Sequence, residues 1–345
     1  MGVLVRLDVE RLDLATAFEF RITHGGGRGH ENTLVRVEHE GVVGLGEASP
    51  AHYYGENRAL VEAALATWGP LLGDDPFALD AIDRRLDVAL EGQRSARAAL
   101  ETALHDWIGR RLGAPVWKLL GLDASRVPLS SVTLGMASAE EMERKLETVR
   151  DFPVLKVKLG RPEDVENLKR IRRTYRGKLR VDANTAWAAA DAVRVLREIE
   201  PLDIELVEQP VARHDLEGLG WVRARVGIPV FADESVHDPE DVPKLAGRVD
   251  GVNLKLMKSG GIRRMHRTLI VARAHGMKTM LGSMVESSLA LSAAAQLAPL
   301  ADYLDLDGHW LLAQDPFRGA PGARGVIALV DEPGLGVRPA SGRSS

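Results

Sequence analysis

The spacing of short apolar runs in the last two thirds of the chain most constrains its fold. A polar or ionisable residue closes successive runs, at Thr133, Lys158, Asp182, Glu208, Asp233, Lys255 and Asp305. The first five intervals are 25, 24, 26, 25 and 22 residues, and the last, of 50 residues, spans two units. A strand followed by a helix fills such a unit, and eight such units close as a barrel whose active site lies at the C-terminal strand ends. We therefore predict a TIM-type (β/α) barrel in which these residues form one ring.

The runs themselves are typical of buried parallel strands. They are too short for helices, and polar or glycine residues flank them. We expect strands at residues 154–159, 179–181, 204–207, 230–232, 251–256, 279–281 and 303–306. A doubly wound open sheet is the alternative, but it gives no comparable reason for ionisable residues at nearly every strand end.

The first third of the chain has a mixed α+β pattern. Residues 3–12 and 33–46 alternate apolar and polar side chains as half-buried strands do, with a turn at Glu40-Gly41. Residues 95–112 repeat apolar side chains every three or four positions, which predicts a helix with one apolar face. The glycine-rich stretch 24–30 and the aromatic stretch 52–55 are predicted to be loops.

Composition excludes several functions. The formal net charge is −4, and the two signs are interspersed, so nucleic acid is not an expected partner. The chain has no cysteine, so any metal must bind to oxygen or imidazole ligands. No apolar run approaches the ~20 residues that cross a bilayer, and residues 1–10 lack a signal-peptide core. We expect a cytoplasmic protein without membrane partners, and a homo-oligomer is compatible with the sequence.

Three acids in the predicted ring indicate a metal site. Asp182, Glu208 and Asp233 close three successive strands. A lone acid at such a place is more often a helix cap, but three converging carboxylates repel one another unless a cation neutralises them. Hard oxygen ligands select Mg²⁺, with Mn²⁺ as the alternative.

Lysines in the same ring indicate proton transfer. Lys156 and Lys158 are two residues apart in one apolar strand, so both point to the same face, which in a barrel is the interior. An edge strand with solvated lysines is the alternative. Two neighbouring ammonium groups beside a dication are expected to have lowered pKa values, which suits a base. Lys255 faces them from the opposite side, the geometry of a racemase or epimerase, whereas Lys258 is expected to have a supporting or surface role.

The last strand end carries two more acids. Asp305 and Asp307 share a face, and together they suit a substrate ammonium group. The alternative is a helix-capping aspartate followed by a solvated one.

Together these motifs resemble the enolase superfamily, in its muconate-lactonizing subgroup. The resemblance covers nearly the whole chain and rests on Lys156-Val157-Lys158, Val181-Asp182-Ala183-Asn184, Val207-Glu208-Gln209-Pro210, Ala232-Asp233-Glu234-Ser235 and the stretch Asn253 to Lys258. It implies an α+β capping domain at residues 1–124, a (β/α)7β barrel at 125–312 and a C-terminal segment at 313–345 that returns to the capping domain. It also makes Asp182, Glu208 and Asp233 the Mg²⁺ ligands.

The same resemblance implies roles for the remaining site residues. Lys158 and Lys255 become the two acid/base residues, and Lys156 becomes the neighbour that tunes Lys158. Asp305 and Asp307 resemble the Asp-x-Asp motif of dipeptide epimerases, which binds the free amino end of the substrate. The implied reaction inverts the α-carbon of the C-terminal residue of a dipeptide by two-lysine 1,1-proton transfer through an enediolate. Further substrate contacts are expected at Thr133, Arg28, Ser283 and Met284, although a lone loop arginine is more often solvated.

Other activities use the same lysines. They are a muconate cycloisomerase, an o-succinylbenzoate synthase and an N-acylamino-acid racemase, and none of their substrates carries an ammonium group. A non-catalytic barrel that acts as a binding protein is an alternative of another class. The mandelate-racemase branch is disfavoured because residues 281–288 contain no histidine.

Overall fold

The structure is a computed structural model that describes residues 3–22 and 25–340. Eight parallel strands form one sheet, in the order β11-β10-β9-β8-β7-β6-β5-β4. They span Val132–Leu134 (β4), Val154–Lys158 (β5), Lys178–Asp182 (β6), Ile204–Glu208 (β7), Val230–Ala232 (β8), Gly251–Lys255 (β9), Lys278–Gly282 (β10) and Tyr303–Asp305 (β11). The first and last strands of this order, β11 and β4, meet where the amide of Ser131 donates to the carbonyl of Leu304 at 3.0 Å, which nearly closes the barrel. The predicted barrel is confirmed.

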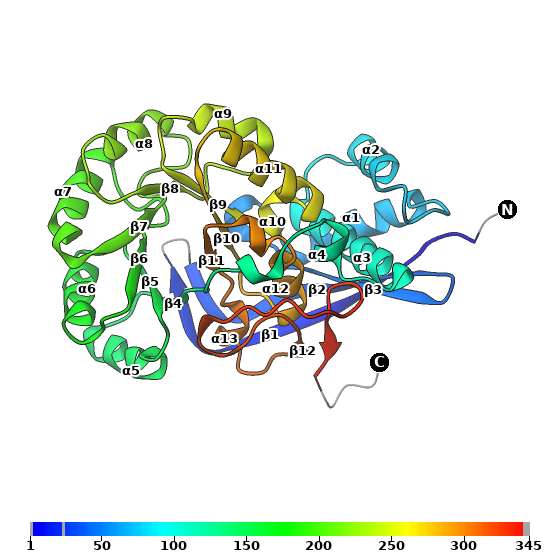
Figure 1. The fold of residues 1–345 in the computed structure, drawn as a ribbon, viewed down its shortest axis with the longest axis horizontal. Coiled ribbons are helices and arrows are strands. Elements are labelled where there is room, and N and C mark those ends of the chain that lie inside the picture. Colours follow the sequence, from blue (N-terminus) through cyan, green and yellow to red (C-terminus); the bar gives the residue numbers. More distant parts are fainter. Residues whose placement is uncertain (1–2, 23–24, 341–345) are drawn as a thin grey trace.

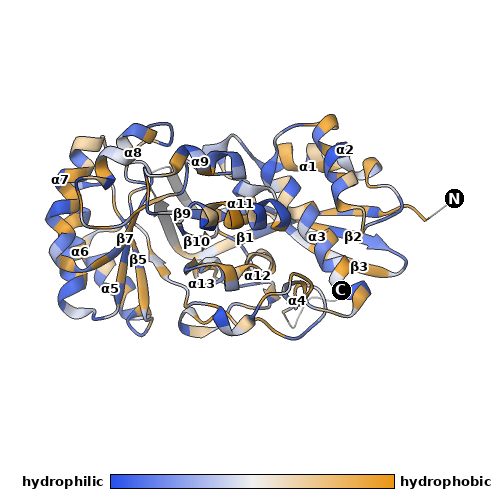
Figure 2. Ribbon diagram, turned by 45° about the horizontal axis from the view of Figure 1, so that its top comes forward, coloured by the Kyte–Doolittle hydropathy of each residue, from blue (hydrophilic) through white to orange (hydrophobic). Residues whose placement is uncertain are grey.

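Helices cover the outside of this barrel (Figure 1). They span Ala139–Val149 (α5), Pro162–Thr174 (α6), Ala189–Ile199 (α7), Leu216–Arg223 (α8), Val242–Leu245 (α9), Leu256–Ser259 (α10), Ile262–Ala274 (α11), Ser288–Ala295 (α12) and Gly308–Leu311 (α13). Hydrophilic and hydrophobic residues alternate along α5 to α7, as helices with one buried face require (Figure 2). The helix after the last strand, α13, has four residues, whereas a (β/α)8 barrel would have a full helix there; this is the (β/α)7β pattern.

The N-terminal region combines an antiparallel sheet with helices. Its strands are β1 (Arg6–Ile22), β2 (Gly25–His39) and β3 (Val42–Ala48), and its helices are α1 (Arg58–Trp68), α2 (Leu79–Ala89), α3 (Arg94–Leu112) and α4 (Val116–Leu119). The predicted turn at Glu40-Gly41 joins β2 to β3, with both residues at positive φ. A Cβ on Gly44 or Gly46 would overlap the backbone of α3, so these two glycines let β3 pack directly on that helix.

Three local predictions were wrong in this region. Gly25 to His30 is not a loop but the first part of β2, paired with β1 from Ile22↔Gly25 to Leu14↔His30; His24 lies outside the described residues. Glycines supply the main-chain groups of a ladder without the apolar alternation from which a strand is predicted. Residues 52–54 form a 3-10 turn. Helix α3 is buried on nearly all sides and not on one face, because it lies between β3 and α10.

The N-terminal sheet reaches the barrel through a long arm. The hairpin of β1 and β2 extends to β4 (Figure 1), and the amide of Ala313 donates to the carbonyl of Ala15 at 2.8 Å. The C-terminal segment crosses in the other direction, where the amide of Leu335 donates to Asp106 of α3 at 2.8 Å. Two segments far apart in the sequence therefore tie the N-terminal region to the barrel.

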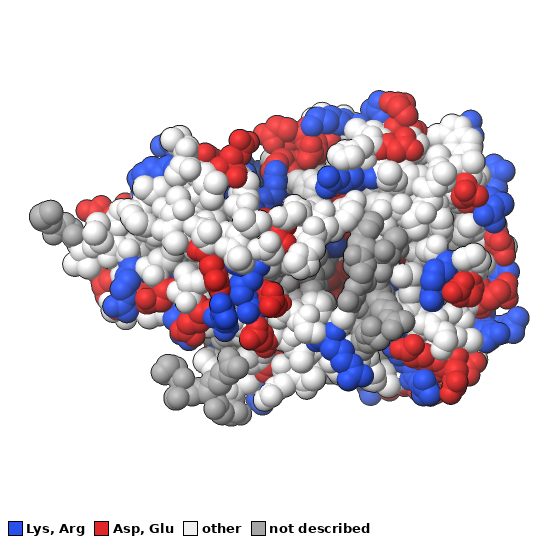
Figure 3. Space-filling view, turned by 180° about the vertical axis from the view of Figure 1, so that it is seen from behind, with Lys and Arg blue, Asp and Glu red and all other residues white. Residues whose placement is uncertain are grey.

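The described surface carries both signs of charge. Basic and acidic side chains are interspersed over the face seen in Figure 3. Among the described residues, no helix combines the length and the apolar character needed to span a membrane.

Candidate active site

The predicted ring residues lie side by side at the C-terminal ends of the strands. Lys158 pairs in register with Asp182, and Asp182 with Glu208. Across the barrel, Gly282 pairs with both Lys255 and Asp305. All of these ionisable residues are buried. The parallel sheet therefore brings them to one level of the barrel interior.

The three acids of the ring are close enough to share one ion. One carboxylate oxygen each from Asp182, Glu208 and Asp233 lies within 4.8 Å of the others. All three side chains are fully buried. Their supporting donors are the amide of Asn184, at 2.9 Å from Asp182, and the side chain of Asn253, at 2.6 Å from Glu208. These donors orient the carboxylates, as the neighbours of metal ligands do.

The electrostatics of the three acids differ. Burial and the nearby Asp182 raise the pKa of Glu208 well above its usual value. Burial also opposes the charge on Asp182 and Asp233, but lysines outweigh it and lower the pKa of both. Four buried lysines therefore keep part of this acid cluster ionised.

Lys158 and Lys255 flank the acids from two sides. The Lys158 Nζ donates to Asp182 Oδ2 at 2.6 Å, and the Lys255 Nζ donates to Asp233 Oδ2 at 2.7 Å. The two lysines come from β5 and β9, and the three strands that lead to the acids, β6, β7 and β8, lie between them. The arrangement leaves an amine at each side of whatever occupies the centre.

The predicted lowering of the lysine pKa was wrong for Lys156. Burial lowers the pKa of Lys156, but Asp305, Glu208 and Asp182 outweigh it and raise the value well above its usual range. Lys255 behaves likewise, with Asp233 as its strongest partner. The prediction counted the repulsion between lysines and did not count the ion pair of Lys156 with Asp305.

Asp305 and Asp307 lie together next to Thr133. The Thr133 hydroxyl donates to Asp305 at 3.3 Å, and its amide donates to Asp307 at 2.6 Å. Burial and the neighbouring Asp305 raise the pKa of Asp307 to about 7. Asp307 stands at the start of α13, but its side chain makes no capping hydrogen bond to that helix. The helix-cap alternative therefore does not account for this acid pair.

The loop residues predicted to contact substrate are more scattered. The Ser283 hydroxyl donates to the carbonyl of Asp305 at 3.3 Å, which places it beside the acid pair. Met284 follows Ser283 and is half-buried, whereas Arg28 lies on β2 and is exposed. Tyr54, from the 3-10 turn, lines a pocket together with Lys258, and burial, followed by the charges of Asp233 and Glu234, raises its pKa.

Two supporting residues were underrated or missed from the sequence. Lys258 is fully buried, and its Nζ contacts Asp233 Oδ1 and donates to the Asp233 carbonyl at 2.5 Å. A surface position for Lys258 is thus wrong, and a supporting position is right. Asn253 was missed, although it precedes Lys255 by two residues and must share its face of β9.

The charged groups of the barrel interior have a simple balance. Six buried carboxyl groups and four buried ammonium groups surround the candidate metal site, and with all ten ionised their formal charge is −2. They are Asp182, Glu208, Asp233, Glu234, Asp305 and Asp307, and Lys156, Lys158, Lys255 and Lys258. The excess of acids over lysines and the three carboxylate donors both fit a divalent cation such as Mg²⁺.

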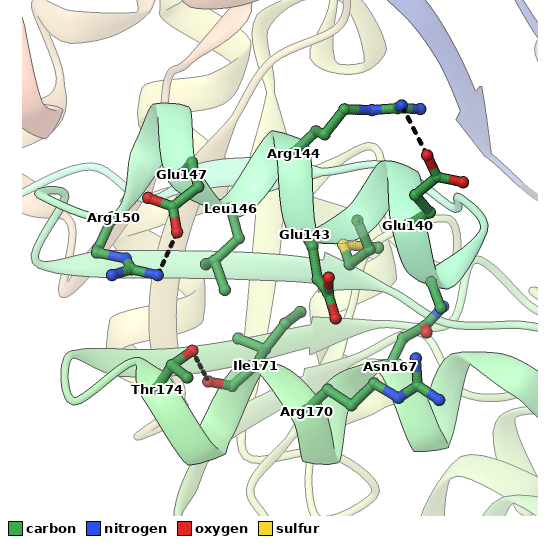
Figure 4. A pocket seen from close by; sticks show the side chains of 12 residues that line it. Glu140, Glu143, Arg144, Leu146, Glu147, Arg150, Asn167, Arg170, Ile171 and Thr174 are labelled. Atoms are coloured by element: carbon green, nitrogen blue, oxygen red, sulfur yellow. Dashed lines mark hydrogen bonds and ion pairs between the residues drawn. The ribbon is translucent and has the colours of Figure 1, made fainter.

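A pocket elsewhere on the barrel has no such chemistry. It has a volume of about 460 Å³ and lies between α5 and α6. Figure 4 shows that its rim carries the ion pairs Arg144–Glu140 and Arg150–Glu147 over Leu146. None of the predicted site residues lines it.

Comparisons with known proteins identify the family of this chain. Residues 14–121 match the mandelate racemase / muconate lactonizing enzyme N-terminal domain, and residues 137–342 match the enolase C-terminal domain-like model. The L-Ala-D/L-Glu epimerase of Bacteroides thetaiotaomicron is 39% identical over 88% of this chain and 80% of its own length.

Two solved structures have the same fold. The substrate-liganded L-Ala-D/L-Glu epimerase of Bacillus subtilis is 32% identical, with a TM-score of 0.93 over 99% of this chain and 100% of that one. The dipeptide epimerase of Enterococcus faecalis, complexed with Mg and the dipeptide L-Leu-L-Tyr, is 31% identical, with a TM-score of 0.91 over 97% and 99%. The chain therefore belongs to the enolase superfamily, in its mandelate racemase and muconate lactonizing enzyme family.

Proposed function

We propose that this chain is a Mg²⁺-dependent dipeptide epimerase that inverts the α-carbon of the C-terminal residue. The observation that carries the proposal is the placement of Lys158 and Lys255, each hydrogen-bonded to a different acid of the same three-carboxylate cluster. The similar proteins named above are epimerases of dipeptides.

Asp182, Glu208 and Asp233 would hold the metal. When bound, Mg²⁺ supplies a Lewis acid that stabilises the negative charge which proton removal places on the substrate carboxylate. The lysines and asparagines around the three acids fix their side chains before any ligand arrives, so little reorganisation is needed during the reaction.

Lys158 and Lys255 would move the proton. A substrate α-carbon between them meets one amine on each face, so one lysine removes the proton and the other returns it from the opposite side. Lys156 is placed to hold Asp305 and the acids in position through its ion pairs, and in this way it supports Lys158.

Asp305 and Asp307 would bind the substrate ammonium group. Burial raises the pKa of Asp307, so a cation beside the pair would favour ionisation of both acids. Thr133, Ser283 and Met284 lie at or beside this pair and are proposed to contact the substrate. Arg28 is proposed to pair with an acidic substrate side chain, which its exposed position on β2 permits.

Mass spectrometry of a dipeptide library in deuterated water tests the proposal. Each turnover replaces the α-hydrogen by deuterium, so the substrate gains mass at its C-terminal residue. We expect labelled dipeptides in the presence of Mg²⁺ and none after chelation. Labelled N-acylated amino acids without labelled dipeptides would contradict the proposed substrate, and metal binding without any labelling would indicate a binding protein.

A further inference from the structure

One helix of the N-terminal region contacts the barrel beside Lys255. Helix α3 lies against α10 and α11, the two helices that follow β9 (Figure 1). Lys255 is both the last residue of β9 and the residue from which α10 begins. A shift of α10 would therefore move the backbone that carries the Lys255 side chain.

Glu101 of α3 holds the start of α11. Its carboxylate accepts hydrogen bonds from the amides of Ile262 and Arg263, the second at 2.9 Å. Both amides belong to the first turn of α11, where backbone N–H groups have no partner within the helix. Gly261 precedes them at a φ of +130°, and a Cβ there would overlap the Glu101 carboxylate. The carboxylate reaches the two amides because residue 261 has no side chain.

Arg94, the first residue of α3, joins two segments of the barrel. Its guanidinium pairs with both carboxylate oxygens of Asp238 and donates to the carbonyl of Lys258 at 3.2 Å. Asp238 lies in the segment that follows β8 and Asp233, and Lys258 belongs to α10. One side chain of the N-terminal region therefore connects the segments that follow Asp233 and Lys255.

These two contacts come from one face of α3. Arg94 and Glu101 are seven residues apart, which is about two helical turns. Between them, Arg97 is buried and donates to Asp87 of α2 at 2.5 Å, and Asp87 pairs in turn with Arg264 of α11 at 3.1 Å. Helices α2 and α3 together therefore hold the start of α11 in a fixed position.

The segment after Lys158 has a different support. Arg161, in the loop after β5, donates to the carbonyl of Ala137 at 3.1 Å and to Asp164 at 2.8 Å. Ala137 follows β4 and Asp164 belongs to α6, so both contacts lie within the barrel. In the described part of the chain, the hydrogen bonds and ion pairs of α3 reach the segment after Lys255 but not the loop after Lys158.

We propose that Arg94 and Glu101 are positioning residues for Lys255, and that they affect proton transfer on one face of the substrate only. The inference rests on the proposed function, because it takes Lys158 and Lys255 to act on opposite faces of the α-carbon. A catalytic side chain must be held in place by its neighbours, and a displacement of about 1 Å can slow a reaction roughly 100-fold. Loss of these contacts slows proton transfer through Lys255 and leaves proton transfer through Lys158 in place.

Exchange of the α-hydrogen in deuterated water tests the inference. The initial rate is measured separately from the two epimers of one dipeptide that the wild-type protein labels. Deuterium in the recovered, uninverted substrate reports the lysine that faces the hydrogen of that epimer. Lys255→Ala identifies the epimer that depends on Lys255. In Glu101→Ala and Arg94→Ala we expect exchange from that epimer to fall roughly 10- to 100-fold, whereas exchange from the other epimer stays close to that of the wild type.

Asp106→Ala is the matched control on the same helix. Asp106 is fully buried and accepts the amides of Leu45 at 2.9 Å and Leu335 at 2.8 Å, neither of which follows a strand that carries a site lysine. A substitution that only loosens the N-terminal region lowers exchange from both epimers together. Asp106→Ala should therefore leave the ratio of the two exchange rates at its wild-type value. Exchange through Lys158 in the Glu101 and Arg94 variants shows that their barrel is folded.

The outcomes separate this inference from the proposed function. Absence of labelling of every dipeptide by the wild-type protein would overturn the proposed function. Labelling by the wild type, with equal losses from both epimers or an unchanged ratio in Glu101→Ala and Arg94→Ala, would overturn the positioning role alone. The same change of ratio in Asp106→Ala would also overturn it.

Discussion

Two interiors of the molecule are equally buried but opposite in chemistry. The core of the N-terminal region is apolar and includes Val61, Leu65, Trp68 and Leu100, each fully buried. The barrel interior is buried to the same degree but holds carboxylates and ammonium groups. Burial of apolar surface stabilises the fold, whereas burial of charge opposes it unless the charges are paired. The candidate functional residues therefore lie in the interior whose buried charges oppose the stability of the fold.

Removal of either lysine of the charged interior should have the largest effect on activity. Lys158→Ala and Lys255→Ala are each expected to lower epimerisation by roughly 10²- to 10⁴-fold, because each removes a group that carries the proton. The measurement is kcat from deuterium incorporation and from optical inversion. Lys244→Ala, at an exposed lysine of α9, should leave activity unchanged. Full activity in either ring variant would remove that lysine from the mechanism.

Truncation in the apolar interior should have the opposite signature. Trp68→Ala is expected to lower the free energy of unfolding by about 3–5 kcal/mol, because it leaves a cavity among fully buried neighbours. Urea denaturation measures this change. Trp221→Ala serves as the control at a partly exposed tryptophan. Equal effects of the two substitutions would contradict the assignment of Trp68 to a packed core.

Neutralising one acid of the pair should separate the substrate classes. Asp305→Asn is expected to raise the barrier for dipeptides by about 2–5 kcal/mol, because it removes a buried partner of the ammonium group and of Lys156. Asp302→Asn, just before the same strand and paired with Lys278, is the control. Steady-state kinetics with a labelled dipeptide measures both. Unaltered turnover in Asp305→Asn would favour a substrate without an ammonium group.

A pH profile should show the smallest effect. Burial raises the pKa of Glu286 from 4.5 to about 8. The folded chain therefore holds a proton that the unfolded chain releases between these values, and this contribution to stability falls as pH rises through the window. Glu286→Gln removes the titration, so its melting temperature should gain on the wild type between pH 5 and pH 8. Parallel melting profiles would contradict this account of Glu286.

The sequence predicted the charged interior better than the surrounding scaffold. The regular spacing of the apolar runs predicted that Asp182, Glu208 and Asp233 lie at neighbouring strand ends. This prediction does not depend on the loops, because parallel strands in one sheet have their C-terminal ends at the same edge. The ion pair of Lys156 with Asp305 joins β5 to β11, 149 residues apart in the sequence, so it depends on barrel closure and leaves no local pattern.

Other features lie beyond local sequence patterns for similar reasons. The glycine-rich part of β2 has no apolar alternation, and only its pairing with β1 makes it a strand. The burial of Lys258 depends on the loop after β8, whose carbonyl groups it contacts. The domain boundaries at residues 124 and 312, the cytoplasmic location and the homo-oligomeric state stay predictions.

Metal titration tests the central claim most directly. Calorimetry should detect one Mg²⁺ or Mn²⁺ ion per chain, bound at the three-acid cluster of the barrel interior. Asp182→Asn and Asp233→Asn are each expected to weaken that binding at least roughly tenfold, while Asp302→Asn leaves it unchanged. Wild-type metal affinity in both variants would contradict the account, because the ion would then not be bound by the three-acid cluster.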